Sequence, residues 1–133
     1  MHTVSRDFHF CYGHRLLEHP GRCAHLHGHN ATIRITLTAE SLDRFGMVVD
    51  FGELKRTLGA WIDTELDHKM LLSENDPLLK TLREAGEPIV VVPFNPTAEN
   101  IARLIYEKAA TFGFAVASVT LWETQNCSAT YAP

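Results

Sequence analysis

The sequence predicts an α+β domain in which two helices pack on one face of an antiparallel sheet. Alternating apolar residues indicate strands near both ends of the chain, and two segments with apolar residues at helical spacing lie between them. Short turns join the strands in pairs, and this order of elements favours antiparallel pairing. With 133 residues and no linker or low-complexity segment, we expect a single domain covering 1–133.

The first two strands are predicted from the parity of their apolar residues. Apolar side chains recur at alternate positions over 4–12, broken only by Arg6, and His14 shares the parity of their face. A turn signal at 19–22 then reverses the chain. The next strand is the clearest element, because apolar residues alternate with threonine or arginine over 31–38. Each strand should therefore have one buried and one exposed face.

The two helices are predicted from apolar spacing and caps. Asp50 opens a capping-box pattern, and apolar residues keep helical spacing behind it over 51–66. Thr97 is a good cap for a second helix, which Gly113 ends. The remaining predicted segments are an irregular stretch after Asn75, a short β-like run at 89–92, and two C-terminal strands at 115–123 and 129–131.

Composition narrows the classes of function. The chain is 45% hydrophobic and 21% charged, as in globular proteins, and its net charge of −4 without a basic stripe argues against a nucleic-acid partner. It has neither a signal-peptide pattern nor an apolar stretch near the ~20 residues that span a bilayer, so we expect no membrane partner. Its three cysteines form no CxxC pair, which favours reduced thiols and a cytoplasmic location.

Histidines near the first two strand ends form a candidate metal site. The side chains of His27 and His29 share a face only if this segment is extended, and they carry the apolar parity of the second strand backwards. His14 ends the first strand on the equivalent face and is the natural third ligand. Three protein ligands with an open position are typical of catalytic zinc. The alternative is hydrogen-bonded core histidines, and His25 is a weaker fourth candidate ligand.

Cys23 lies just upstream of this pair and has three interpretations. As a fourth zinc ligand it would close the tetrahedron and make the site structural. As a free thiolate near the metal it would act as a base or nucleophile. As a small buried apolar residue it would do neither, and the sequence leaves all three interpretations open.

Two further positions carry ionisable groups that need an explanation. Asp67 and His68 follow the first helix as a carboxylate–imidazole pair suited to proton transfer, or His68 simply occupies the negative helix end. Glu123 lies on the inner parity of a predicted strand, where a carboxylate needs a metal, an arginine or a ligand donor as partner. The alternative is that the strand end is exposed and Glu123 is hydrated.

These residues belong to a set of six motifs: Phe10-x-x-Gly-His14-Arg-Leu, Cys23-x-x-x-His27-Gly-His29-Asn, Asp50-Phe51-x-x-Leu54-Lys55, Leu66-Asp67-His68, Asn95-Pro-Thr-Ala-Glu-Asn100 and Glu123-Thr124. In this order, the set resembles the family of 6-pyruvoyltetrahydropterin synthases and 6-carboxytetrahydropterin synthases over nearly the whole chain. The three residues between the cysteine and the His-Gly-His segment are similar to the spacing in the 6-carboxytetrahydropterin synthases of queuosine biosynthesis.

The resemblance implies a tunnelling fold, in which a four-stranded antiparallel sheet with two helices on one face assembles into trimeric barrels and commonly into hexamers. It places the active sites between subunits of this homo-oligomer. It also implies a role for each matched residue: zinc would be bound by His14, His27 and His29, protons would be moved by Cys23, Asp67 and His68, the pterin would be anchored by Glu123, and the substrate would be approached by Thr97 and Glu99.

The activity that the resemblance implies is that of a zinc-dependent lyase. It would convert 7,8-dihydroneopterin triphosphate, a pterin triphosphate, into 6-carboxy-5,6,7,8-tetrahydropterin, acetaldehyde and triphosphate. The alternatives are 6-pyruvoyltetrahydropterin formation, or a non-catalytic zinc- or pterin-binding protein whose zinc site is closed by one cysteine and three histidines. Candidate cations for the triphosphate are Arg22, Lys55 and Lys69.

Overall fold

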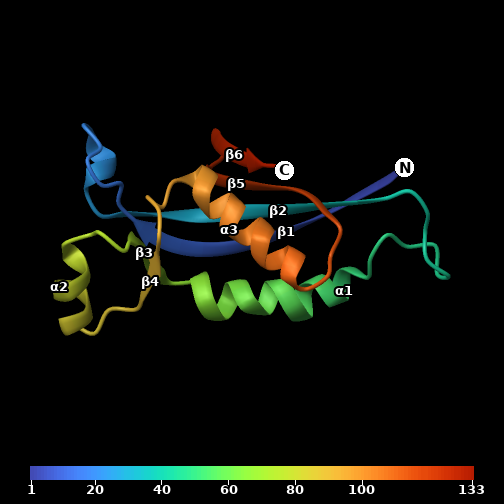
Figure 1. Ribbon diagram of the computed structural model, residues 1–133, viewed down its shortest axis with the longest axis horizontal. Helices are drawn as coiled ribbons and strands as arrows, with labels where there is room; N and C mark the ends of the chain where they lie inside the picture. Colours follow the sequence, from blue (N-terminus) through green and yellow to red (C-terminus); the bar gives the residue numbers. More distant parts are fainter.

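The computed structural model describes residues 1–133 as an α+β fold built around one curled sheet (Figure 1). The strand order is β4-β3-β1-β2-β5-β6. The β1–β2, β2–β5 and β5–β6 pairs are antiparallel, whereas β3 pairs in parallel with both β1 and β4. The strands are β1 (His2–His14), β2 (His27–Ala39), β3 (Lys69–Ser73), β4 (Ile89–Val92), β5 (Val116–Thr124) and β6 (Cys127–Tyr131).

The predicted four-stranded antiparallel sheet is therefore wrong in strand number. Its four strands are present as β1, β2, β5 and β6, but β3 and β4 extend the sheet and make it mixed. β3 has the sequence Lys-Met-Leu-Leu-Ser, which lacks the alternation of a strand with one exposed face. Because β3 ends in three buried residues, its pairing depends on the sheet around it rather than on a local pattern.

The helix predicted over 51–66 is confirmed. It begins as α1 (Phe51–Leu54) and continues through Lys55–Gly59 and Ile62–Leu66, where wider π-type hydrogen bonds replace the usual α-helical pattern. The Asp50 carboxylate caps its first turn by accepting from the Gly52 N–H at 2.8 Å.

The second predicted helix is also confirmed as α3 (Ala98–Thr111), which Thr97 caps and which ends before Gly113, whose φ is 88°. The Thr97 hydroxyl caps it by accepting from the Asn100 N–H at 3.2 Å. None of the helices is both long and apolar enough to cross a membrane.

Both long helices pack on the same face of the sheet, as predicted. The first helix and α3 contribute one apolar stripe each, and these stripes meet the inward-facing residues of β1, β2 and β5 in a single core (Figure 1). The completely buried side chains of this core include Ile33, Ile35, Leu54, Leu58, Ile62, Ile101, Ile105 and Leu121. The polar residues of β1 and β2 alternate with these core residues and therefore lie on the opposite face of the sheet.

A third helix, α2 (Leu78–Glu84), was not predicted and lies at the end of the molecule beside β3 and β4 (Figure 1). Asp76 precedes it, and its buried carboxylate forms a two-point ion pair with Arg15 just after β1, with Nε–Oδ2 at 2.8 Å. The same carboxylate accepts from the Leu78 N–H at 2.8 Å. This ion pair therefore joins the end of β1 to the start of α2.

We expect Asp76→Ala to lower the free energy of unfolding by about 3 kcal/mol, because it leaves the Arg15 guanidinium without its buried partner. Urea unfolding at constant protein concentration measures the change. As a control, Asp7→Ala breaks the exposed pair with Arg34 and should cost at most about 1 kcal/mol. Equal losses in the two variants would contradict this assignment.

The Asp76 ion pair also predicts a pH dependence of stability. Burial opposes ionisation of Asp76, but the hydrogen bonds from Arg15 and from the Leu78 N–H hold its pKa below the ordinary 3.8. A carboxyl whose pKa is lower in the folded state stabilises the fold above its unfolded pKa, and this contribution disappears as the pH falls through the folded pKa. The stability difference between the wild type and Asp76→Asn should therefore shrink below a pH of about 4.

Candidate metal centre

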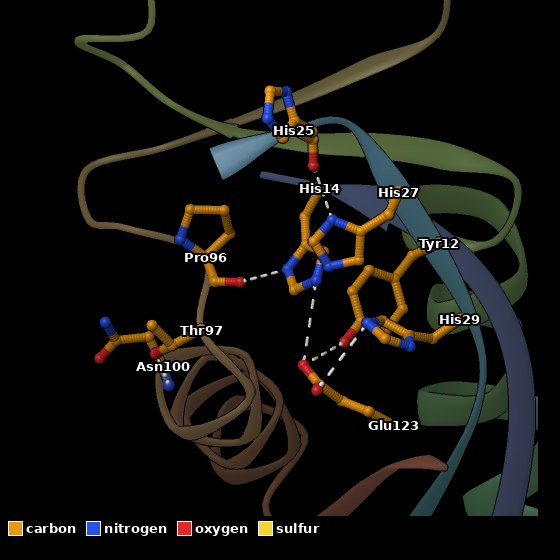
Figure 2. A network of polar contacts seen from close by, with 9 residues as sticks. All are labelled: Tyr12, His14, His25, His27, His29, Pro96, Thr97, Asn100 and Glu123. Carbon is orange, nitrogen blue, oxygen red and sulfur yellow. Dashed lines mark hydrogen bonds and ion pairs between the residues drawn. The ribbon is translucent and has the colours of Figure 1, made fainter. Parts of the chain in front are cut away.

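Three histidines converge at the paired ends of β1 and β2 (Figure 2). The strand register places His14 opposite His27, and Tyr12 opposite His29. The imidazole ring centroids of His14 and His27 are 4.5 Å apart, and those of the other two pairs are 5.1 and 5.2 Å apart. One ring nitrogen from each histidine lies within 4.8 Å of the others, so the three could hold one metal ion.

Backbone carbonyls fix the protonation of two of these rings. The Nδ1 atom of His14 lies 2.7 Å from the carbonyl oxygen of Pro96, and Nδ1 of His27 lies 2.7 Å from that of His25. A carbonyl only accepts, so each Nδ1 carries the hydrogen and each Nε2 keeps its lone pair. Burial lowers the pKa of His14 and favours its neutral form.

The free nitrogens provide the test of whether a metal fits. Nε2 of His14 and Nε2 of His29 are buried and have no hydrogen-bond partner. Buried polar atoms without a partner are rare, and a metal ion in the space between these lone pairs would satisfy them. The predicted ligand set thus has an arrangement compatible with a metal ion, and the hydrogen bonds of His14 and His27 leave the Nε2 atoms of these two rings free to bind it.

Glu123 on β5 faces the same space (Figure 2). Its Oε1 lies 3.9 Å from Nε2 of His14, and its Oε2 lies 3.8 Å from Nε2 of His29. The hydroxyl of Tyr12 donates to Oε1 at 3.3 Å. Burial and the neighbouring Glu123 charge raise the pKa of Tyr12, so its hydroxyl stays a neutral donor. The carboxylate of Glu123 therefore has the Tyr12 hydroxyl and the ring nitrogens of His14 and His29 as its neighbours.

Cys23 lies in a short helical turn (Arg22–Ala24) between β1 and β2. Its sulfur does not belong to the ligand group formed by the three histidines. The Cys23 carbonyl accepts from the Leu16 N–H at 2.8 Å, and the Asn95 side chain accepts from the Leu17 N–H at 2.9 Å. These bonds tie the loop that carries the cysteine to the segment before α3. The geometry therefore favours three ligands over a closed site with four.

Asp67 and His68 form a connected pair, but away from the histidine cluster. Asp67 accepts from Nδ1 of His68 and from the backbone N–H of Cys11, each at 2.8 Å. The bond from Cys11 and the contact with His68 hold the pKa of Asp67 below its ordinary value although burial opposes this. His68 has a left-handed backbone with φ of 59°, and its side chain is 79% exposed. The pair thus presents a fixed imidazole to solvent.

The sheet order shows why this pair does not reach Glu123 of the same chain. His68 precedes β3 on one side of β1, whereas Glu123 lies on β5 beyond β2. Three strand spacings separate the two positions, about 14 Å. His68 borders a cleft of about 690 Å³ whose lining also includes Cys11, Asn30, His27 and His29, but not Glu123.

The other predicted substrate residues lie at the start of α3. Thr97 follows Pro96 directly, so the residue that supports His14 and the residue that caps α3 are neighbours (Figure 2). Glu99 is exposed in the first turn. Thr97 therefore has a structural role as a cap and also lies next to the metal centre.

Three members of this network were not predicted: Tyr12, the carbonyl of His25 and the carbonyl of Pro96. A signal for Tyr12 existed, because a tyrosine on a buried strand face needs a partner for its hydroxyl. The carbonyl contacts had no signal in the sequence, since any residue type supplies the same group.

The fold and the site together define an α+β protein with three histidines, at the ends of two paired strands, that could hold one metal ion. The chain belongs to the 6-pyruvoyl tetrahydropterin synthase family, whose family model matches residues 3–133.

Curated relatives cover almost the entire chain. A 6-carboxy-5,6,7,8-tetrahydropterin synthase from Rickettsia typhi is 39% identical and covers 96% of this chain and 97% of its own length. The protein of the same name from Aquifex aeolicus is 32% identical, with 96% of each chain covered. Among solved structures, an uncharacterized protein from Wolinella succinogenes matches with a TM-score of 0.82 and 29% identity, over 98% of this chain and 97% of its own.

The 6-pyruvoyl tetrahydropterin synthase of Caenorhabditis elegans matches with a TM-score of 0.74 and 24% identity, over 98% of this chain and 94% of its own. At that identity the match supports the fold alone. The α+β class and the family therefore agree with the resemblance in the sequence motifs.

Proposed function

We propose that the protein is a zinc-dependent lyase that converts 7,8-dihydroneopterin triphosphate into 6-carboxy-5,6,7,8-tetrahydropterin, acetaldehyde and triphosphate. The observation that carries the proposal is the group of three histidine nitrogens, two of them buried and without partners, beside a carboxylate. Zinc held there would act as a Lewis acid on the substrate side chain. The names of the curated relatives support the carboxy-forming reaction.

In this proposal, Glu123 anchors the pterin. The pterin edge that carries N3–H and the 2-amino group presents two donors, and a carboxylate accepts both through charge-assisted hydrogen bonds. Glu123 is only 25% exposed, so these bonds would form in a shielded site. Thr97 and Glu99, at the start of α3, would approach the same substrate.

Cys23 and His68 move protons in the proposed reaction. Asp67 orients His68 by accepting a hydrogen bond from its Nδ1, as a carboxylate does for a histidine in general acid–base catalysis. Since the pair lies on the far side of β1 from Glu123, we propose that it serves the metal centre of a neighbouring copy. The site would then be complete only in an oligomer.

The sheet edges support a barrel built from several copies. β1 pairs with β3 only through Tyr12–His14, so most of β1 lacks a partner strand on that side. β6 is a free edge at the other end of the sheet. Free edges attract further strands, and joining β6 of one copy to β1 of the next would close the sheet around a homotrimer or hexamer. Size-exclusion chromatography with light scattering tests this, and a monomer would contradict it.

We further propose that the protein acts in the cytoplasm, in queuosine biosynthesis. The three-residue spacing between Cys23 and His27 supports this pathway, because it is similar to the spacing in the 6-carboxytetrahydropterin synthases of queuosine biosynthesis. The three cysteines are all free, which suits a reducing compartment.

Product identification tests the proposed reaction. Purified protein with zinc is incubated with 7,8-dihydroneopterin triphosphate, and the pterin product is identified by mass spectrometry. We expect the 6-carboxy product together with triphosphate. A 6-pyruvoyl product would assign the chain to the other activity of the family, and an unchanged substrate would overturn the lyase.

X-ray absorption at the zinc edge separates the lyase from a closed structural site. We expect nitrogen or oxygen neighbours at about 2.0–2.1 Å, and no sulfur. A zinc–sulfur distance of about 2.3 Å would show that Cys23 closes the site, contrary to the proposed catalytic role.

A further inference from the structure

Tyr12 is fixed between the metal ligands and the core. It lies on β1 opposite His29 and two residues before His14, and it is 3% exposed. Its ring centroid is 5.1 Å from that of His14, 5.6 Å from that of His29 and 5.4 Å from that of Phe10. Packed on these sides, the ring has little freedom to swing its hydroxyl elsewhere.

The only hydrogen bond of the Glu123 side chain comes from this hydroxyl, at 3.3 Å (Figure 2). The other close groups are the unpartnered Nε2 atoms of His14 and His29, at 3.9 and 3.8 Å. The carboxylate oxygens therefore lie close to two of the three ring nitrogens, although Glu123 does not belong to the group of three residues that could share one metal ion.

A carboxylate in this position can bind either the metal ion or the substrate. Glutamate is a common zinc ligand, and a small movement toward the histidines would let it fill the fourth position of the metal. Filling it would close the site and would remove the carboxylate from the pterin. A fixed neutral donor on Oε1 opposes that movement, because the carboxylate would lose its one hydrogen bond.

We propose that Tyr12 is a positioning residue that holds Glu123 beside the metal centre, so that the carboxylate remains available to the substrate and the fourth metal position stays open. The role of the substrate in this statement rests on the proposed function. The effect on metal coordination does not, because it can be measured without any substrate.

The test uses Tyr12→Phe, which removes the hydroxyl and keeps the ring. The matched control is Tyr106→Phe, because Tyr106 on α3 packs against Tyr131 of β6 and its hydroxyl has no hydrogen-bond partner. Each full-length protein is loaded with Co²⁺, and two quantities are measured: the visible absorption spectrum and the rate of metal release to a chelator. Steady-state kinetics with 7,8-dihydroneopterin triphosphate are measured on the zinc forms.

We expect Tyr12→Phe to bind one metal ion per chain, to show a changed cobalt spectrum, and to release the metal more slowly than the wild type, since Glu123 becomes a fourth ligand. We expect its KM to rise by roughly 10- to 100-fold, the effect of losing a hydrogen bond to a charged group. Adding Glu123→Gln to this variant should restore the spectrum and the release rate of the wild type.

A cobalt spectrum and a release rate equal to those of the wild type would overturn the proposal, whatever happens to KM. Glu123→Gln alone provides a second test if Tyr12→Phe does not fold. This variant should keep the wild-type cobalt spectrum, and a change would mean that Glu123 is already a ligand. If the wild-type protein binds metal but does not turn over the substrate, the proposed function fails. The cobalt spectrum and the rate of metal release still test the role of Tyr12 in that case.

Discussion

Replacing Cys23 with alanine should reduce kcat by about 10²–10⁴-fold, the range for loss of a general acid–base group, while one zinc ion per chain is retained. The reason is geometric. The sulfur lies outside the ligand group of three histidines, and its loop is held by backbone bonds that alanine keeps. Metal analysis and steady-state kinetics on the same preparation measure both quantities.

Cys127→Ala is the matched control for this variant. Cys127 is an exposed thiol at the start of β6 and has no contact with the histidines. We expect wild-type kcat and zinc content in this control. If Cys23→Ala lost its zinc, the cysteine would be a ligand and its assignment to proton transfer would be wrong.

Replacing His27 with alanine should abolish both metal binding and turnover. The remaining His14 and His29 provide two nitrogens, fewer than the three protein ligands of a catalytic zinc centre. The fold should survive, because His27 is only partly buried and lies at the beginning of β2. Zinc content after dialysis and the circular dichroism spectrum check these two expectations.

His9→Ala is the control here, since His9 is an exposed histidine whose ring bonds only to Thr32. It should keep stoichiometric zinc and wild-type turnover. Zinc retained at full stoichiometry in His27→Ala would contradict the three-histidine site.

The sequence predicted those parts of the fold in which one face is buried and the other is exposed. Apolar residues alternate along β1 and β2 and recur at helical spacing over 51–66, so their parity reveals the core face directly. The same parity brought His14, His27 and His29 to one side, where the structure places them together.

The alternation of apolar residues does not predict β3, α2 or the position of His68 in the fold. β3 is buried by its neighbours and pairs in parallel, which depends on where the chain returns to the sheet rather than on local pattern. The adjacency of Asp67 and His68 was visible in the sequence. That they lie on the other side of β1 from Glu123 follows only from the strand order.

The hydrogen bond between Tyr12 and Glu123 could not be predicted from the sequence either, since 111 positions separate the two residues. Each alone could be recognised as a polar group on an apolar face. Their pairing needed the antiparallel registers of β1 with β2 and of β2 with β5, which bring positions 12, 29 and 123 into one cluster.

The most direct test of the central claim is acetaldehyde formation as a function of zinc occupancy. The protein is depleted of metal, reloaded with zinc in steps, and assayed with 7,8-dihydroneopterin triphosphate at each step. We predict that acetaldehyde and 6-carboxy-5,6,7,8-tetrahydropterin rise together and in proportion to occupancy, up to one zinc per chain. Acetaldehyde formation that is independent of zinc, or no acetaldehyde at full occupancy, would contradict the claim.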